Sequence, residues 1–562
     1  MQRRWVFRGN ADVESVAFIQ KELKVPRFIA EMLVQRGFCD SIQAEAHLRP
    51  KLRALNPPEA IPGMMAAADR VLKALRLRER IVIYGDYDVD GTTSLAILCR
   101  IFRAYGANVP CFLPLRAEEG YGLSEVGIAR CRELHDPQLL IAVDCGTTSL
   151  FEINNLRADG VDVVVLDHHE PLPQLPDCAA LVNPKCGQDF HYLCSAGIVF
   201  KLAHTMVKLS PVDGLDLRDF LDLVAMATVA DIVPLVDDNR IFVRHGLERM
   251  AHTRWPGIEA LMKISGVEIP IQVSDVGFRL GPRINAAGRL GSASEALQLL
   301  LTDDPVEAVR LAAVLDSHNR ERQTVERHVV AEAENWVREN HNPETDISII
   351  AASRDWHIGV IGVVASRIMR QYHRPTFIIG FDADGVGKGS GRSIEGLSLV
   401  SLLRDCEPHL QKFGGHEMAA GISISEENLP SFRQTFESAA RRLATPQMLS
   451  PSLHLDAELT LVDVDADLLE ALDLMEPFGT ENAKPVLFSC GVTPLSAPRV
   501  LKEKHLRIEF AAGRRRVAAV FFNAPVNDLP RPPWDVAFTL EWNLWQGRAE
   551  PQVRIVEIRH SA

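Results

Sequence analysis

The sequence lacks the features that mark disulfide-bonded, zinc-ribbon and membrane-spanning proteins. Its ten cysteines are scattered, and none forms a Cys-x-x-Cys pair, which excludes a zinc ribbon and a thioredoxin-type motif. No stretch approaches about 18 uninterrupted apolar residues, the length that a membrane-spanning helix needs. The basic start of the chain is not followed by an apolar segment, as a secretory signal requires. We therefore expect a cytoplasmic protein with reduced thiols and no membrane partner.

The chain also lacks an excess of positive charge. Its 61 Lys and Arg residues face 74 Asp and Glu residues, which gives a net charge of −13. This does not exclude nucleic-acid binding, because local clusters of basic residues bind phosphates and acidic metal ligands lower the total. There is no internal repeat and no low-complexity tract. Hydrophobic residues make up 47% of the 562 residues, so disorder of the whole chain is excluded and several folded domains are expected.

Strands and helices alternate in the first half of the chain. Residues 63–80 have the apolar spacing of an amphipathic helix, and residues 81–106 contain an apolar strand, a turn rich in Asp and Gly, and a helix. A strand followed by a turn recurs in residues 139–150 and 161–170. Continuous apolar strands separated by helices are typical of a parallel sheet that is covered on both faces. The sequence therefore predicts an α/β domain.

Three further segments follow. Residues 306–342 contain neither Gly nor Pro and predict one long helix that bridges two domains, or two helices broken near Ser317. Residues 346–440 have the pattern of a second α/β domain. Short alternating runs between residues 455 and 562 favour an all-β C-terminal domain, a small closed barrel. The expected domains are an N-terminal segment (1–60), a first α/β domain (61–265), a connecting region (266–343), a second α/β domain (344–447) and a barrel (448–562).

Acidic residues gather where the predicted apolar elements of the first domain end. Asp86, Asp88 and Asp90 follow its first strand, and further acidic turns contain Asp144, Asp167-His168-His169 and Asp231. The carboxyl ends of neighbouring parallel strands meet in one crevice. Carboxylates would repel one another there without a cation, and carboxylates with imidazole suit Mn²⁺ or Mg²⁺. Two such ions that share a carboxylate form a site for phosphoryl transfer, since they activate water and stabilise both reacting oxygens.

Each of these features has a less specific explanation. Asp-x-Asp-x-Asp-Gly also begins a calcium-binding loop, but position 12 counted from Asp86 is Ile97 instead of the required Glu. An isolated Asp after a strand is commonly the N-cap of a helix, and an isolated His pair commonly lies in the core or on the surface. The occurrence of all four turns in this order favours the metal site.

Five motifs together resemble the DHH phosphoesterase superfamily. They are GDYDVDG, AVDCGTTS, VLDHHE, VADIVPL and GGHEMAAG, at residues 85–91, 142–149, 165–170, 229–235 and 414–421. The chain is most similar to the branch of single-strand-specific bacterial exonucleases. This resemblance covers nearly its whole length and implies that the C-terminal barrel is similar to an OB-fold. It departs from the pyrophosphatase and cyclic-dinucleotide branches, which have a His four residues before the first motif Asp, where this chain has Val82.

The resemblance implies a role for each residue of the acidic turns. Asp86 and Asp144 would bind one of two metal ions, Mn²⁺ or Mg²⁺. The other ion would be bound by Asp88, Asp144, His168 and Asp231. His169 would face the scissile phosphate, Asp167 would orient the two histidines, and Asp90 would support the turn.

Glycine-rich segments with basic residues are candidates for phosphate binding. Residues 387–393 predict an anion-binding nest, and His416 is expected in a tight glycine turn before a helix of small residues. Ordinary turns are the alternative. The resemblance implies that Arg116, Ser390 and Arg392 hold a 5′-terminal phosphate, and that Arg283, Asn285, Arg289 and His416 contact the strand near the metals.

Basic and aromatic residues are interspersed in the C-terminal segment. They are Lys502, Lys504, Arg507, Arg514, Arg515, Arg516, Phe521, Phe522, Trp534, Trp542 and Trp545. This combination suits single-stranded nucleic acid, whose bases stack on aromatic rings while its phosphates pair with basic groups. The alternative is that the aromatic residues form the core of the barrel.

The resemblance implies a metal-dependent exonuclease that degrades single-stranded DNA 5′ to 3′ into mononucleotides. It also implies roles in DNA recombination and repair, including mismatch repair, beside a single-strand-binding protein and a RecQ-like helicase at the nucleoid. One alternative is a phosphodiesterase for oligoribonucleotides or cyclic dinucleotides, which needs no C-terminal barrel. The other is a DNA-binding scaffold, whose relatives lose metal ligands that this chain retains.

Overall fold

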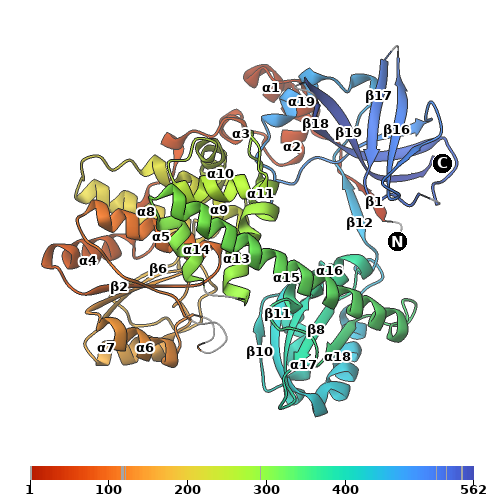
Figure 1. Cartoon of the computed structure of the whole chain (residues 1–562). Coiled ribbons are helices and arrows are strands. Elements are labelled where there is room, and N and C mark those ends of the chain that lie inside the picture. Colours follow the sequence, from red (N-terminus) through yellow and green to blue (C-terminus); the bar gives the residue numbers. More distant parts are fainter. Residues whose placement is uncertain are drawn as a thin grey trace. The chain divides into compact units, whose positions relative to one another are not determined.

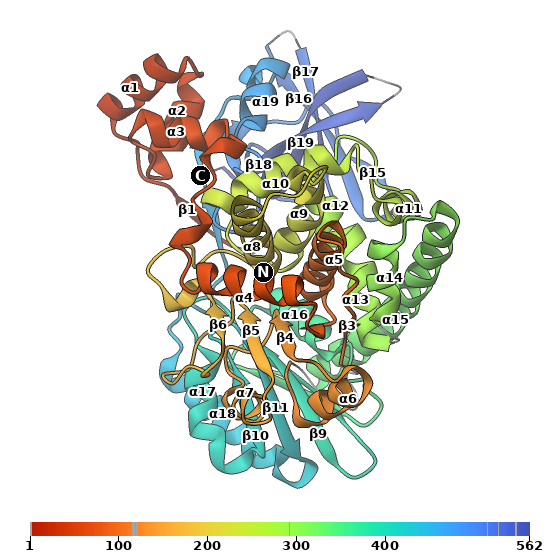
Figure 2. The same cartoon turned by 90° about the vertical axis from the view of Figure 1, so that its left-hand side faces the viewer.

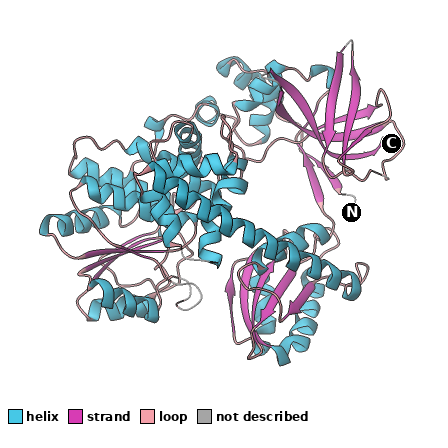
Figure 3. Cartoon of the chain, in the orientation of Figure 1, coloured by secondary structure: helices cyan, strands magenta, loops and turns pink. Residues whose placement is uncertain are grey.

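The computed structural model describes residues 3–114, 119, 122–290, 293–513, 515–526, 528–545 and 548–561, without the side chains of 289, 290, 544, 545 and 548. The chain divides into two compact units. Figures 1 and 3 show its helices and strands. The larger unit comprises Trp5–Gly281, Leu300–Pro305 and His454–Ala562, and the smaller one Met1–Arg4, Pro282–Leu299 and Val306–Leu453. All ten cysteines are free.

A five-stranded sheet forms the centre of the first α/β domain, in the larger unit. Its strands are β2 (Ile81–Gly85), β3 (Cys111–Phe112), β4 (Leu139–Val143), β5 (Asp162–Leu166) and β6 (Ala180–Val182). They pair in the order β3-β2-β4-β5-β6, and every pairing is parallel. Strands β2 and β4 are buried along their whole length, as expected for a sheet covered on both faces. The predicted parallel α/β domain is confirmed.

Helices cover this sheet on both sides, with α4 on one side and α6 and α7 on the other (Figure 2). The helices in this part of the chain, whether or not they touch the sheet, are α4 (Met64–Leu77), α5 (Val89–Ala104), α6 (Glu125–His135), α7 (Leu150–Ala158), α8 (Ser195–Leu209), α9 (Leu221–Ala230), α10 (Asp237–Met250), α11 (Pro256–Ser265) and α12 (Val273–Asp275). A π-helical turn, η5 (Val276–Leu280), follows them. Helix α9 is apolar on all sides because it packs between α5, α8 and α10. A Cβ on Gly246 of α10 would lie 2.3 Å from the carbonyl oxygen of Leu221, so glycine permits this close packing.

The C-terminal domain is built from strands, as predicted. They are β13 (Ala457–Glu458), β14 (Leu487–Val492), β15 (Arg499–Leu501), β16 (His505–Ala512), β17 (Arg515–Phe521), β18 (Trp534–Trp545) and β19 (Arg548–His560), in the order β13-β14-β18-β19-β17-β16-β15. One hydrophobic core joins this sheet and α19 (Ala466–Asp473) to the N-terminal helices α1 (Val13–Leu23), α2 (Arg27–Gln35) and α3 (Ser41–Leu48). The two ends of the chain therefore share a core, which the sequence did not indicate.

The smaller unit contains a mixed sheet and one long helix. Its strands β7 (Ile349–Ser353), β8 (Thr376–Phe381), β9 (Val386–Arg392), β10 (Lys412–Gly415) and β11 (Ala419–Ser425) pair in the order β10-β11-β9-β8-β7. Its helices are α13 (Gly281–Leu290), α14 (Ser294–Leu301), α15 (Pro305–Asn340), α16 (Ile361–Tyr372), α17 (Leu399–Cys406) and α18 (Leu429–Leu443), and β12 (Ser452–Leu455) follows. Helix α15 runs unbroken for 36 residues, so the prediction of a single helix is confirmed.

Two local predictions in the smaller unit are wrong. Residues 387–393 were expected to form an anion-binding nest, but they lie almost entirely in strand β9. Its glycines face the core, where a Cβ on Gly391 would lie 2.4 Å from the ring of Phe377. The small residues after His416 form strand β11 instead of a helix. In both segments glycine or alanine serves close packing within the sheet.

Candidate metal centre

The register of the five-stranded parallel sheet places three acidic turns next to one another at the same edge of the sheet. Gly85 pairs with Val143, and Val143 pairs with Leu166. The residues that follow, Asp86, Asp144 and Asp167, therefore leave the sheet side by side at the carboxyl ends of β2, β4 and β5. This is the edge at which open α/β sheets bind ligands.

Ligand atoms from these turns gather in three overlapping groups. Within each group the carboxylate oxygens and imidazole nitrogens lie within 4.8 Å of one another. The groups are Asp86, Asp88 and Asp144; Asp90, His168 and Asp231; and Asp144, His168 and His169. Every acidic residue that the sequence predicts as a ligand belongs to at least one group. In the described part of the chain Asp88 groups with Asp86 and Asp144, whereas the resemblance placed it with His168 and Asp231.

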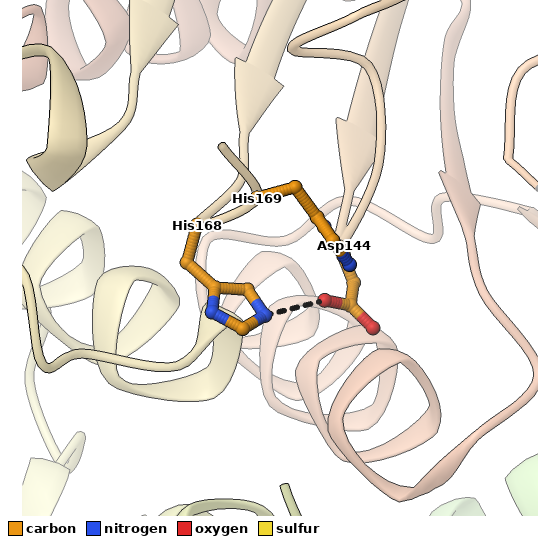
Figure 4. Close-up of side chains that lie close together, drawn as sticks. All are labelled: Asp144, His168 and His169. Carbon is orange, nitrogen blue, oxygen red and sulfur yellow. Dashed lines mark ion pairs between the residues drawn. The ribbon is translucent and has the colours of Figure 1, made fainter. Parts of the chain in front are cut away.

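Asp144 belongs to two of these groups. It adopts a left-handed conformation (φ 62°), its carboxylate is buried, and it accepts a hydrogen bond of 2.9 Å from the hydroxyl of Ser195. The ring of His168 points toward it, with Nε2 3.4 Å from Oδ1 (Figure 4). Burial, together with the charges of Asp90 and the other acidic residues, raises the pKa of Asp144 well above its usual value. A cation would remove this penalty on the charged form.

His168 offers a neutral nitrogen to the site. Its Nε2 lies 3.6 Å from an oxygen of Asp231 and 3.7 Å from one of Asp90. Burial, and then the charge of the adjacent His169, lower the pKa of His168 to about 3. Neutral imidazole is the form that binds metal ions.

His169 has the opposite protonation state. Its Nδ1 lies 2.7 Å from Oδ1 of Asp167. Burial opposes a charge on His169, but this hydrogen bond and the charges of Asp167 and nearby carboxylates raise its pKa to about 9. The imidazole is therefore a cation at neutral pH, suited to a phosphate oxygen that gains negative charge.

Asp167 is held by four donors. Oδ1 accepts from the backbone N–H groups of His168 (2.8 Å) and His169 (3.2 Å) and from the His169 ring, and Oδ2 accepts from the N–H of Thr147 (2.9 Å). Burial raises the pKa of Asp167, but the hydrogen bonds lower it by more, so that the net pKa lies below the usual range of an Asp. Such a carboxylate stays charged and fixes the orientation of both histidines.

Asp90 is occupied by the start of helix α8. Its two oxygens accept from the backbone N–H groups of Ser195 (2.7 Å) and Ala196 (2.8 Å). Burial and the charge of Asp88 raise the pKa of Asp90 to about 6. These contacts are those of a residue that supports the turn, although Asp90 also lies within reach of His168.

Three residues of the site were missed by sequence reasoning. Ser195 donates to Asp144 and carries one of the N–H groups that Asp90 accepts. Asn183 donates to the hydroxyl of Thr147 (2.9 Å) and to the carbonyl of His169 (2.8 Å), which fixes the DHH turn. Thr147 lies within a motif that the sequence analysis quoted, but neither Ser195 nor Asn183 has a neighbouring pattern that indicates a function.

The donors fit divalent cations of the Mg²⁺ and Mn²⁺ kind. Carboxylates and one neutral imidazole are hard and borderline ligands, and no thiolate takes part in the groups formed by the described residues. The carboxylates of Asp86, Asp90 and Asp144 are buried beside one another, where like charges are costly without a counter-ion.

A second candidate site lies in the smaller unit. Arg392 donates to the hydroxyl of Ser390 (3.0 Å), and both lie on β9. A Cβ on Gly362, in the first turn of α16, would be 3.2 Å from the Ser390 hydroxyl and 3.3 Å from the Arg392 guanidinium. Across the described ranges no carboxylate forms an ion pair with Arg392, and burial lowers its pKa. A guanidinium, a hydroxyl and a helix N-terminus form an anion-binding set.

The other predicted substrate contacts are less uniform. Arg283 on α13 forms an ion pair with Asp316 of α15 (2.9 Å), and Asn285 lies on the same helix. His416 is exposed in the turn between β10 and β11. Arg116 and the side chain of Arg289 lie outside the described part of the chain.

The aromatic residues predicted to bind bases in the C-terminal domain differ in burial. Trp542 is half-buried, and its indole N–H donates to Asp473 (2.8 Å). Trp534 and Phe521 are buried in the core of the sheet, as the alternative predicted. Phe522 is exposed, and the guanidinium of Arg554 lies 5.1 Å from its ring centroid. The exposed basic residues are Lys502, Lys504, Arg507, Arg515 and Arg516, whereas Arg514 and the Trp545 side chain are outside the described residues.

Three family models match the chain. The DHH family, N-terminal domain, matches residues 80–228, the DHHA1 domain matches 346–442, and the RecJ OB domain matches 455–557. Within the described ranges, no helix is both long and apolar enough to span a bilayer.

The chain is also similar to whole proteins. It is 34% identical over 561 residues to the single-stranded-DNA-specific exonuclease RecJ of Bacillus subtilis, covering 98% of this chain and 70% of that protein. The crystal structure of RecJ in complex with Mn²⁺ from Thermus thermophilus has a TM-score of 0.86 and 32% identity, covering 100% of this chain and 80% of that one. The corresponding Mg²⁺ complex has a TM-score of 0.80 and 31% identity, covering 100% and 79%.

Proposed function

The chain belongs to the RecJ family of single-stranded-DNA-specific exonucleases, and we propose that it hydrolyses single-stranded DNA from the 5′ end, releasing mononucleotides. The resemblance that the motifs predicted is confirmed by the three family matches. A phosphodiesterase for small nucleotides is not favoured. Such an enzyme does not need an OB domain, whereas residues 455–557 of this chain match one. The scaffold alternative is not favoured either, since the acidic residues and His168 are all present.

Two divalent ions, Mn²⁺ or Mg²⁺, are the proposed cofactors. When bound, they activate water and stabilise the entering and leaving oxygens of the phosphate. Asp86 and Asp144 would hold one ion, and Asp88, Asp144, His168 and Asp231 the other, while the position of Asp88 beside Asp86 would also let it contact the first ion. The buried group of carboxylates supports this assignment, as do the Mn²⁺ and Mg²⁺ of the two similar crystal structures.

The residues around the ions have separate tasks. His169, kept protonated by Asp167, would donate a hydrogen bond to the scissile phosphate and stabilise its developing charge. Asp167 would orient His168 through its backbone N–H and His169 through its backbone N–H and its ring, and Asp90 would hold the acidic turn against α8. The proton on the leaving 3′ oxygen would come from solvent or from a nearby group.

The selection of the 5′ end is assigned to the smaller unit. Ser390 and Arg392 would bind the 5′-terminal phosphate together with the first turn of α16. Arg116, which the resemblance assigns to the same phosphate, lies outside the described residues. Arg283, Asn285, Arg289 and His416 are the proposed contacts to the strand. Arg283 would have to share its guanidinium between DNA and Asp316.

The observation that carries the proposal is the buried cluster of carboxylates and one neutral imidazole at the ends of three parallel strands, in a chain that also contains an OB domain.

We further propose that the protein acts in the cytoplasm at the nucleoid, in recombination and repair, beside a single-strand-binding protein and a RecQ-like helicase. The domain limits at residues 60, 265, 343 and 447 complete the proposal.

An Arg392→Ala variant tests the assignment of the 5′ end. We expect it to bind a 5′-phosphorylated strand more weakly than the wild type does, with little change for a 5′-hydroxyl strand, because only the phosphate needs the guanidinium. Arg354→Ala is the matched control, since Arg354 is an exposed arginine of the same unit that pairs with Glu426. Equal weakening of both strands by Arg392→Ala would show that this site does not sense the 5′ phosphate.

A further inference from the structure

The turn that follows Asp231 has an unusual backbone. Asp231 ends helix α9, and the next residue, Ile232, lies in the left-handed region with φ 60°. A β-branched residue is a rare outlier there, because its Cβ substituents clash with the backbone. The Ile232 side chain is 72% exposed, so burial of an apolar group does not hold it in place. The conformation therefore needs support from elsewhere.

That support comes from Thr480, which lies about 250 residues further along the chain. Its hydroxyl donates a hydrogen bond of 2.9 Å to the carbonyl oxygen of Ile232. In return, the backbone N–H of Leu235 donates to the carbonyl oxygen of Thr480, also at 2.9 Å. Thr480 is thus hydrogen-bonded to both ends of the turn 232–235.

The segment that carries Thr480 is itself fixed. Arg240, on α10, donates to the carbonyl oxygens of Met475 (3.0 Å) and Glu476 (2.8 Å). Asn482 donates to the carbonyl oxygens of Met475 (2.9 Å) and Pro477 (2.7 Å). Both Arg240 and Asn482 are buried, so their hydrogen bonds are shielded from water.

Close packing leaves this segment little freedom to move. A Cβ on Gly479 would lie 2.7 Å from the side chain of Leu235, so this residue packs closely against the turn. The hydroxyl of Thr480 is therefore presented to Ile232 by a rigid support and not by a free loop. The segment leads directly into strand β14 of the C-terminal sheet.

We propose that Thr480 is a positioning residue that sets the place of the Asp231 carboxylate, so that the segment leading into the C-terminal sheet completes the metal centre. This inference rests on the proposed function, in which Asp231 is a metal ligand. Metal affinity depends on how well the ligands are held before the ion arrives, and residues behind a ligand commonly change it.

The test compares Thr480→Val with Thr480→Ser in the full-length protein. Valine keeps the shape of threonine but cannot donate to Ile232, whereas serine keeps the hydroxyl. Mn²⁺ binding is measured directly, from the electron paramagnetic resonance signal of free Mn²⁺ during titration. The loss of one hydrogen bond predicts that the dissociation constant of the ion bound by Asp231 is about three- to tenfold higher in Thr480→Val than in the wild type. Thr480→Ser should bind Mn²⁺ as the wild type does.

Thr460→Val is the matched control. Thr460 is also an exposed threonine in the C-terminal half of the larger unit, and its hydroxyl donates to Asp463 instead of to the catalytic domain. This variant should bind Mn²⁺ like the wild type. An equal loss in Thr460→Val and Thr480→Val would contradict a specific role for Thr480.

A second background tests the route through the backbone. Asparagine tolerates the left-handed region, so Ile232→Asn should hold the turn without help. The effect of Thr480→Val on Mn²⁺ binding should then shrink in the Ile232→Asn background. An effect of the same size in both backgrounds would overturn the proposed route.

Asp231→Ala separates failure of this inference from failure of the proposed function. If Asp231→Ala leaves Mn²⁺ binding unchanged, the ligand assignment is wrong. If Asp231→Ala weakens binding and Thr480→Val does not, only the role of Thr480 is refuted. Weaker binding in both variants, with recovery in Thr480→Ser, is the result that the inference predicts.

Discussion

His168 and His169 are neighbours in the chain, yet their pKa values are shifted in opposite directions. His168 is buried among carboxylates, the nearest of which is 3.4 Å from its Nε2, and burial lowers its pKa to about 3. His169 is less buried and has a short contact to Asp167, which holds the proton on its ring. Two adjacent imidazoles can therefore serve as a metal ligand and as a cation for phosphate.

The pKa of His169 is our first prediction. In the metal-free protein its imidazole should titrate near pH 9, above the value of about 6.5 for an unperturbed histidine. The folded-state pKa is the higher one, so the stabilisation from the pair with Asp167 is complete below pH 6.5 and is lost as the pH rises through 9. ¹⁵N-detected NMR titration, assigned with His169→Gln, measures this. Titration of His169 near pH 6.5 would contradict it.

The second prediction separates His169 from the metal ligands. His169→Ala should leave Mn²⁺ binding largely intact but lower kcat by about 10²- to 10³-fold, the usual loss when a donor to the developing charge is removed. Binding is followed by titration with Mn²⁺ and cleavage by release of labelled nucleotide. Asp144→Ala should abolish both, because Asp144 belongs to two ligand groups. Wild-type cleavage by His169→Ala would remove its proposed role.

The acidic residues of the site could be predicted because each directly follows an apolar element. Strand-end position is visible in the sequence, and parallel pairing then brings those ends together. Ser195 and Asn183 could not be predicted, since their contacts depend on how α8 and the turn after β6 return to the sheet. A serine or asparagine in such a position resembles any cap or turn residue.

Elements were predictable where hydrophobic periodicity was long, and not where glycine dominated. Helix α15 and the strands of the catalytic sheet follow from their apolar patterns. In β9 the glycines were interpreted as a loop, but they line a sheet face that packs against Phe377 and Phe381. The sequence does not show which residues pack against a glycine. A glycine that permits close packing therefore cannot be distinguished, from the sequence alone, from a glycine in a flexible loop.

The third prediction concerns the packing of α9, which Asp231 directly follows as the C-cap. In Gly246→Ala the added methyl group would meet the backbone of Leu221, which cannot move without shifting α9. We expect a loss of about 1–3 kcal/mol in the free energy of unfolding of the larger unit. Urea denaturation measures it. Gly9→Ala is the control, because no heavy atom lies within 4 Å of a Cβ there. Equal stability of the two variants would contradict the packing account.

For the whole molecule, the net charge of −13 is compatible with DNA binding because the charges are unevenly placed. Carboxylates gather at the metal site, whereas exposed basic residues occur together in the C-terminal domain. Composition alone therefore did not predict the substrate. The order of motifs along the whole chain did, because each domain by itself is compatible with several functions.

The fourth prediction tests the C-terminal lysines. If Lys502 and Lys504 pair with phosphates, Lys502→Ala/Lys504→Ala should reduce the slope of log affinity for single-stranded DNA against log salt concentration by about 1.4, at about 0.7 per contact. Fluorescence anisotropy at several salt concentrations measures the slope. Lys21→Ala/Lys73→Ala removes two exposed lysines elsewhere and should leave it unchanged. A slope that changes equally in both variants would indicate only a general charge effect.

The most direct test of the central claim is a time course with Mn²⁺ on single-stranded DNA labelled in turn at each end. Duplex DNA, a short RNA, a cyclic dinucleotide and an Asp88→Ala variant serve as comparisons. We predict immediate release of mononucleotide from the 5′ label, sparing of the duplex, and no cleavage by Asp88→Ala. Faster cleavage of the RNA or the cyclic dinucleotide, or first release from the 3′ label, would contradict this account.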